Sequence, residues 1–172
     1  MYNAAHQIPT SVMEDLVLSV CEMFRFLADR RLVNRRHLHI VVLSPDYDPV
    51  QPIKLGILYE TSIGDRDSWE WPYDQYARDK AREALARQCS TSEAGNNPLR
   101  LRSGDVLLTG GFYLDGLAIG VSGVQGEFDE AFSATIAFLI RAVVKLIIKK
   151  HNEADADYLG QIKTTDADLR CA

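Results

Sequence analysis

The residues with the clearest potential for chemistry lie in a glycine-rich run between positions 110 and 130, which ends in an acidic cluster. Within it, Gly120, Gly123 and Gly126 follow an apolar stretch and precede an apolar helical pattern. A strand, a glycine turn and a helix in this order leave free backbone N–H groups at the helix start, where proteins often bind phosphate. The run is therefore a phosphate site, a site for another ligand, or a turn that serves only the fold.

The spacing and charge of this run argue against phosphate. A P-loop needs GxxxxGK followed by Ser or Thr, and no lysine follows these glycines. Glycines spaced three apart also differ from the dinucleotide pattern GxGxxG. Glu127, Asp129 and Glu130 in the first turn of the next helix would repel a phosphate and already complement the helix dipole. A neutral ligand, a cation or a structural turn fits better.

Two side chains near this run are candidates for catalysis. Ser122 lies within G-V-S-G, which is not the GxSxG nucleophile elbow, and no His–Asp arrangement accompanies it. Lys80 lies on a predicted helix and could act as a base if it is buried, whereas an exposed lysine would only extend its stem along the helix surface. An enzyme acting at the glycine-rich turn stays open as an alternative, with no catalytic residue assigned.

Candidate metal ligands are few, and each has an ordinary structural alternative. His37 and His39 fall on one face of a predicted strand, as a metal pair or as polar strand residues. Asp46 and Asp48 lie in a Pro-flanked segment, where such residues usually form a turn. The sequence therefore predicts no metal site.

The elements that must position these residues follow from hydrophobic spacing. Apolar residues recur at helical intervals over residues 11–32, 73–88 and 127–150. Apolar runs of strand length predict one strand pair over residues 37–44 and 52–60 and a second over 104–111 and 112–123. Asp115-Gly116 is a hairpin dipeptide inside the second pair, and the polar residues 90–98 are typical of a loop.

The order of these elements predicts the fold class. Each strand has a close partner along the chain, which favours an antiparallel sheet over a parallel one. We therefore expect an α+β fold in which an antiparallel sheet of four to five strands is covered by three helices. Residues 1–150 would form a single domain, and residues 151–172 a polar C-terminal tail.

Composition narrows the class of partner. The chain has 172 residues and a formal net charge of −5, which argues against a nucleic-acid partner. Its most apolar stretch, residues 131–148, is interrupted by Arg141 and Lys145, so we predict no membrane span. Three scattered cysteines and an N-terminus without a signal-peptide pattern predict a reduced, cytoplasmic protein.

Three motifs together resemble a known family. The block Leu117-Ala118-Ile119-Gly120-Val121-Ser122-Gly123, followed by Asp129 and an apolar helix, is similar to the GAIGVSG-then-Asp signature of the GlcG/HbpS-like haem-degrading domain family. The helix pattern Ala77-x-x-Lys80-Ala81-x-x-Ala84 is similar to the AxxKAxxA helix of that family. Gly110-Gly111 is similar to the double glycine ahead of its last hairpin. Tyr113 departs from the family, which commonly has Pro there, and Leu117 replaces its first glycine.

The resemblance implies a profilin-like layered fold that assembles into homo-oligomers and binds a small ligand, with haem or a related tetrapyrrole as the leading candidate. Haem iron would need an axial side chain, most often His, and no His lies in the matched motifs. A self-assembling scaffold or regulatory module without catalytic activity is the alternative. Ligand contacts are expected at six residues: Gly110, Gly111, Ser122, Gly123, Asp129 and Lys80.

Overall fold

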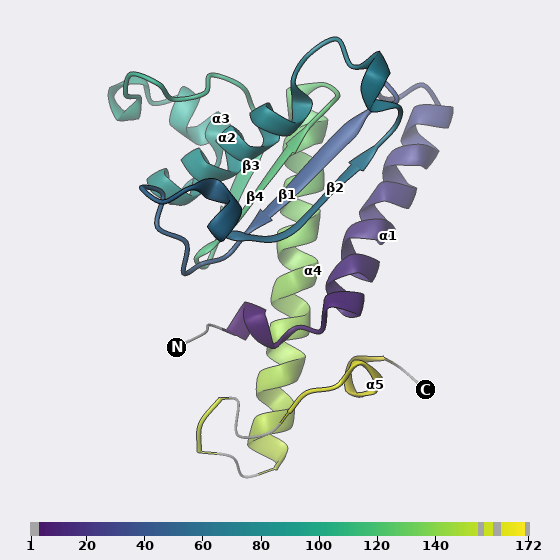
Figure 1. Cartoon of the computed structure of the whole chain (residues 1–172), viewed down its shortest axis with the longest axis vertical. Coiled ribbons are helices and arrows are strands. Elements are labelled where there is room, and N and C mark those ends of the chain that lie inside the picture. The colour runs from purple at the N-terminus through teal and green to yellow at the C-terminus, as the bar shows by residue number, and fades with distance from the viewer. Residues whose placement is uncertain (1–3, 155–156, 160–162, 171–172) are drawn as a thin grey trace.

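The structure, a computed structural model, describes residues 4–154, 157–159 and 163–170. Four strands form one antiparallel sheet in the order β2-β1-β4-β3 (Figure 1). Their bounds are Leu38–Leu43 for β1, Ile57–Ile63 for β2, Gly111–Leu114 for β3 and Leu117–Ser122 for β4. Three long helices accompany the sheet: α1 (Thr10–Asp29), α2 (Tyr73–Arg87) and α4 (Gly126–Glu153). The α+β fold with an antiparallel sheet and three helices is confirmed, and it is consistent with a profilin-like layered domain.

Two hairpins build the sheet, and their inner strands β1 and β4 meet at its centre. The second hairpin turns at Asp115 and Gly116, whose φ angles are 52° and 95°. Positive φ at both positions belongs to a type I′ turn, which matches the twist of the flanking strands. The hairpin dipeptide predicted from the sequence is therefore confirmed.

Two sequence predictions in the second half were wrong. Of residues 104–111, only Gly111 is in a strand. The segment before it runs beside α2, where the Glu83 carboxylate accepts a hydrogen bond from Val106 N at 2.6 Å. Residues 90–98 are not only loop, because Ser90 accepts a hydrogen bond from Glu93 N and caps the short helix α3 (Thr91–Gly95). A long-range hydrogen bond overrides the apolar pattern at the first place, and a local capping bond overrides the polar pattern at the second.

In the first hairpin, β2 begins later than predicted. Its sequence pattern starts at residue 52, but residues 53–55 form a 3-10 turn and the ladder begins at Ile57. Gly56 follows this turn beneath the Tyr47 ring, where a Cβ would lie 2.2 Å from Tyr47 Cγ. The chain thus makes one tight packed turn before it can pair with β1.

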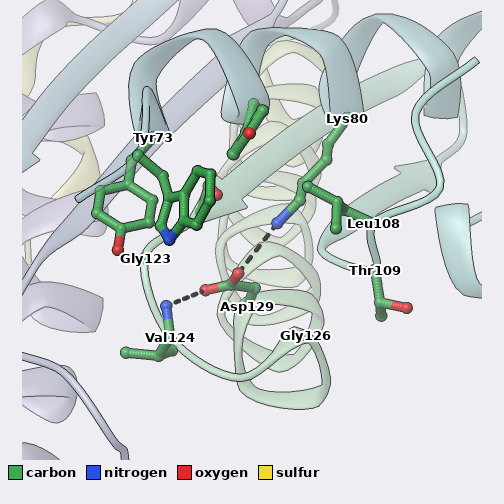
Figure 2. A pocket seen from close by; sticks show the side chains of 11 residues that line it. Tyr73, Lys80, Leu108, Thr109, Gly123, Val124, Gly126 and Asp129 are labelled. Atoms are coloured by element: carbon green, nitrogen blue, oxygen red, sulfur yellow. Dashed lines mark hydrogen bonds and ion pairs between the residues drawn. The ribbon is translucent and has the colours of Figure 1, made fainter. Parts of the chain in front are cut away.

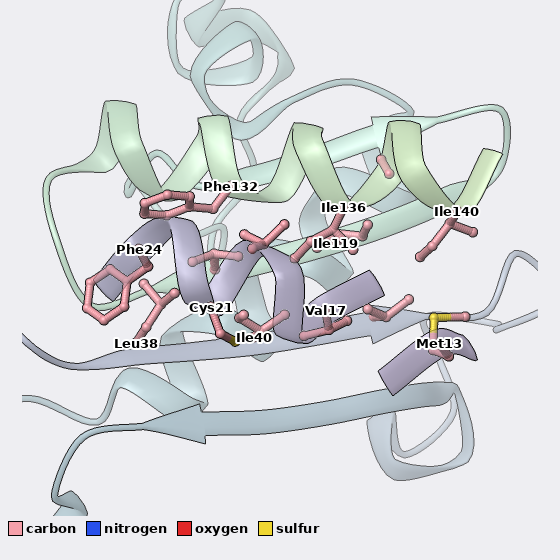
Figure 3. Packing of buried hydrophobic residues seen from close by; sticks show 14 of the residues in the cluster. Met13, Val17, Cys21, Phe24, Leu38, Ile40, Ile119, Phe132, Ile136 and Ile140 are labelled. Atoms are coloured by element: carbon pink, nitrogen blue, oxygen red, sulfur yellow. The ribbon is translucent and has the colours of Figure 1, made fainter. Parts of the chain in front are cut away.

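Helices α1 and α4 cover one face of the sheet with large side chains. Phe24 of α1 meets Phe132 of α4 edge to face, with ring centroids 6.0 Å apart. Ile40 and Ile119 reach up from β1 and β4 into the same cluster, and Ile136 of α4 is fully buried within it (Figure 3). This face holds most of the hydrophobic core.

Helix α2 covers the opposite face at unusually close range. Gly111 and Gly120 are cross-strand partners there, and neither has a side chain to hold the helix away. A Cβ on Gly120 would lie 1.9 Å from Ala77 O, and one on Gly111 would lie 2.4 Å from Lys80 O. Small residues on both surfaces therefore bring the helix backbone almost onto the sheet.

Helix α4 extends beyond the sheet, and the C-terminal segment lies beside it (Figure 1). There Lys150 Nζ pairs with Asp168 at 2.9 Å, and α5 (Asp166–Leu169) adds Leu169 to the edge of the core. By length and composition alone α4 could cross a membrane, although the face that carries Phe132 and Ile136 is buried in the core. The expected absence of a membrane partner stays a prediction.

Candidate functional site

The centre of the candidate site is Lys80, which is buried because α2 lies so close to the sheet. Lys80 is only 2% exposed, so it is not a lysine that extends along the helix surface. Its Nζ donates to Val121 O at 2.9 Å and to Asp129 Oδ2 at 3.0 Å. The amine therefore joins α2 both to the end of β4 and to the start of α4.

Asp129 completes the pair from the first turn of α4. Its side chain is also 2% exposed, and its second oxygen accepts a hydrogen bond from Val124 N at 3.2 Å. The carboxylate thus stabilises the turn that links β4 to α4. One side chain holds both the turn and the buried amine.

Burial shifts both groups of this pair toward their neutral forms. Desolvation lowers the pKa of the Lys80 ammonium, although the Asp129 carboxylate beside it acts in the opposite direction. Desolvation also raises the pKa of Asp129 to about 6, and Lys80 and the backbone N–H groups of residues 123 and 124 only partly offset it. Both shifts narrow the gap between the two pKa values and so lower the free-energy cost of moving a proton from Lys80 to Asp129.

An open pocket of about 330 Å³ reaches this ion pair (Figure 2). Trp71, Tyr73 and Tyr76 supply aromatic walls from α2 and the segment before it. Leu108 and Thr109 close the opposite side from the segment before β3. Mostly apolar walls around a few polar groups are typical of small-molecule sites.

Tyr73 adds a further polar group to the pocket lining, and this group has no protein partner among the described residues. Its side chain is 4% exposed, and its hydroxyl has no hydrogen-bond partner among the described residues. Burial raises the pKa of this phenol, which keeps it a neutral donor. A buried hydroxyl without a partner lowers stability, and here it belongs to a residue that lines the pocket.

The absence of a side chain at Gly110 makes room for the Lys80–Asp129 ion pair. A Cβ on this residue would lie 2.7 Å from Lys80 Nζ and 2.8 Å from Asp129 Cβ, and its φ is +133°. Thr91 Oγ1 accepts hydrogen bonds from both Gly110 N and Gly111 N, and the Ser133 hydroxyl donates to Gly110 O at 2.7 Å. The double glycine is therefore held by side chains from α3 and α4.

The six predicted site residues lie together, but they have different positions. Lys80, Ser122, Gly123 and Asp129 line the pocket. Gly110 and Gly111 lie behind it, against Lys80. Gly123 also permits a close backbone approach, because a Cβ there would lie 2.1 Å from His37 O. Their role in binding a ligand stays a prediction.

Several lining residues were absent from the sequence prediction. Tyr76 was recoverable, because it lies four residues before Lys80 on the same helix stripe. No sequence pattern pointed to Leu108, Thr109 or Val124, because only the tertiary fold brings their segments to the pocket.

Histidine-ligated haem does not fit this pocket. The common axial ligands of haem iron are His, Cys, Met and Tyr, and of these only Tyr73 and Tyr76 line the pocket among the described residues. Both ring nitrogens of His39 are engaged, by Ser62 Oγ and Glu60 Oε1, each at 2.8 Å. The described residues contain no group of three or more His, Cys, Asp or Glu suited to a metal ion.

These features define a layered α+β domain with an open pocket between α2 and the start of α4. No family model and no curated protein matches the chain. Among solved structures, the fold is similar to protein ORFY from Klebsiella pneumoniae, of family DUF336, with a TM-score of 0.52 and 15% identity. The match covers 78% of this chain and 91% of that protein, and at this identity it shows the fold alone.

Proposed function

We propose that the chain is a GlcG-like domain of the DUF336 type that binds a small organic ligand in the pocket above the Lys80–Asp129 pair. The observation that carries the proposal is a pocket that reaches the buried pair and is lined by Tyr73, whose hydroxyl has no partner among the described residues. The similarity to protein ORFY and the glycine motifs support the family assignment. Neither identifies the ligand.

The chemistry of the walls favours a flat, largely apolar ligand with one polar group. Aromatic rings of Trp71, Tyr73 and Tyr76 offer faces on which a planar ring can pack. The Tyr73 hydroxyl and the Lys80 amine offer hydrogen bonds to a carbonyl or hydroxyl oxygen. Because the buried pair is neutral overall, the pocket has no strong preference for a charged ligand.

Calorimetric titration with 2-naphthalenemethanol tests this proposal, because the probe combines a flat apolar body with one hydroxyl. We expect saturable binding that weakens by about fivefold or more in Tyr73→Phe, since one hydrogen bond contributes roughly 1 kcal/mol. Tyr158→Phe is the matched control, because Tyr158 is 74% exposed and does not line the pocket. Equal binding by both variants, or no saturable binding, would refute the proposed site.

Titration with hemin separates the tetrapyrrole hypothesis from a smaller ligand. The pocket predicts no spectrum of His-ligated haem, because no His lines it among the described residues. Saturable hemin binding with such a spectrum would show that the tetrapyrrole site lies elsewhere on the molecule.

Self-assembly is a second candidate function, favoured by an apolar surface on α4. Phe138 and Leu146 are each 48% exposed there, and Ile148 is 42% exposed. Exposed apolar side chains grouped on one helix often mark a subunit contact. Light scattering of the intact chain and of Phe138→Asp would test this, with a smaller assembly expected for the variant. A monomer in both cases would exclude assembly through this surface.

A further inference from the structure

Lys80 combines a desolvated amine with access to the proposed pocket. An ammonium has three N–H donors, and only two of those on Lys80 have acceptors, Val121 O and Asp129 Oδ2, among the described residues. The residue also lines the pocket. Its third N–H position is therefore the one through which the nitrogen can meet a ligand.

The surroundings of this amine match those of lysines that act as nucleophiles. A lysine in a desolvated pocket loses its proton more easily, and the neutral amine is the reactive form. Asp129 lies 3.0 Å away and can accept that proton, because burial raises the pKa of its carboxyl to about 6 while it lowers the pKa of Lys80. The proton can thus pass from Lys80 to Asp129 within the pair.

We propose that Lys80 forms a reversible imine with an aldehyde or ketone group of a small aromatic ligand held in this pocket. The inference rests on the proposed function, and it names the chemical class of the ligand. Tyr73 lines the same pocket and carries a hydroxyl without a partner among the described residues. Trp71 and Tyr76 provide walls for the aromatic body.

The step balances without any further reactant. Lys80 first transfers one proton to Asp129, and its lone pair then attacks the carbonyl carbon. A C–N bond forms as the carbon–oxygen π bond breaks, and the oxygen takes the proton back from Asp129 to give a carbinolamine. Loss of this hydroxyl, together with a second proton from the nitrogen, releases one water and leaves a protonated imine. The positive charge of the original ammonium thus stays on the nitrogen beside Asp129.

Reductive trapping tests this inference in the intact chain. The protein is incubated with 2-naphthaldehyde and sodium cyanoborohydride at neutral pH, and modified lysines are located by peptide mass spectrometry. Exposed Lys54 and Lys145 serve as internal controls. We expect Lys80 to be modified at least about tenfold faster than either control, because a neutral amine reacts where an ammonium does not. Modification of Lys54 and Lys145 with Lys80 unmodified would overturn the inference.

Asp129→Asn tests the role of the carboxylate. The variant keeps an oxygen for Val124 N but cannot accept the proton from Lys80. We expect trapping at Lys80 to slow by about tenfold or more, since general-base assistance typically contributes a factor of this size or larger. Unchanged trapping at Lys80 in this variant would overturn the assigned proton transfer.

The alcohol probe separates failure of this inference from failure of the proposed function. Binding of 2-naphthalenemethanol requires the pocket but not the imine. If the alcohol binds and Lys80 stays unmodified by the aldehyde, the binding function stands and the imine does not. If the alcohol fails to bind and Lys80 is also unmodified, both proposals fall.

Discussion

The two faces of the sheet are packed in opposite ways. On one face, α1 and α4 fill the space above the strands with rings and branched side chains such as Phe24, Phe132 and Ile136. On the other, Ala77 and Ala81 of α2 lie against Gly120 with almost no side chain between them. The first face gains stability from buried apolar area, whereas the second positions a helix backbone closely enough to bury Lys80 against Asp129.

The largest difference between the faces should appear when a ring is removed. Phe132→Ala deletes a buried ring from the α1/α4 face and should lower the free energy of unfolding by about 3–5 kcal/mol. Phe138→Ala, on the same helix but 48% exposed, should lower it by less than about 1 kcal/mol. Urea denaturation measures both, and equal losses would contradict the assigned core.

Adding a single methyl group on the α2 face should lower the free energy of unfolding by nearly as much. Gly120→Ala places a Cβ 1.9 Å from Ala77 O, so α2 must move away from the sheet. We expect a loss of about 3 kcal/mol or more, together with a changed Lys80 environment. Gly95→Ala is the control, because a Cβ there meets nothing within 4 Å. A Gly120→Ala protein as stable as the control would show that the helix does not pack this closely.

The buried pair should give stability an unusual pH dependence. The pKa of Asp129 is raised from 3.8 to about 6, so the folded chain holds this proton more tightly than the unfolded chain. The free energy of unfolding contributed by this group therefore rises as pH falls from about 6 to about 4. Relative to Asp129→Asn, which does not titrate there, the wild type should gain up to about 3 kcal/mol.

Urea denaturation of both proteins between about pH 4 and about pH 7 measures this difference. A wild type that instead loses stability relative to Asp129→Asn as pH falls would mean that the pKa of the carboxyl is depressed. The pair would then be an ordinary stabilising ion pair, and the contrast between the two faces would weaken.

A smaller effect is expected behind the pocket. Thr91→Val keeps the shape of the side chain but removes the oxygen that accepts from Gly110 N and Gly111 N. We expect a loss of about 2 kcal/mol, because two buried N–H groups lose their acceptor. Thr135→Val removes only a hydroxyl on the surface of α4 that donates to Ala131 O, and it should be nearly neutral. Similar losses in both variants, measured by thermal unfolding, would contradict this role of Thr91.

The fold was largely predictable because its elements carry strong local signals. Helical spacing identified α1, α2 and α4, and Asp115-Gly116 fixed the second hairpin. The prediction for the segment before β3 failed because apolar Leu107 and Leu108 resemble a strand. In the fold, the nearby backbone N–H groups of Val106 and Gly110 donate to Glu83 and Thr91 instead of to a neighbouring strand. Local patterns do not record such long-range partners.

The candidate site was only partly predictable from the sequence. Asp129 and the glycines were visible from their place at a strand–helix turn. The burial of Lys80 depends on how closely α2 approaches the sheet, and this distance is set by glycines on two other strands. The Tyr73 hydroxyl has no hydrogen-bond partner among the described residues, and this is a property of the folded chain that no local pattern predicts.

The most direct test of the account follows Lys80 and Tyr73 together by NMR. With 15N-labelled lysine and 13C-labelled tyrosine, 2-naphthalenemethanol is added and the side-chain signals of both residues are followed. We predict that the two signals shift in a saturable way with one shared dissociation constant, while the exposed Lys145 does not respond. If neither signal shifts, or if Lys145 responds as strongly as Lys80, then the face that α2 covers does not form the binding site.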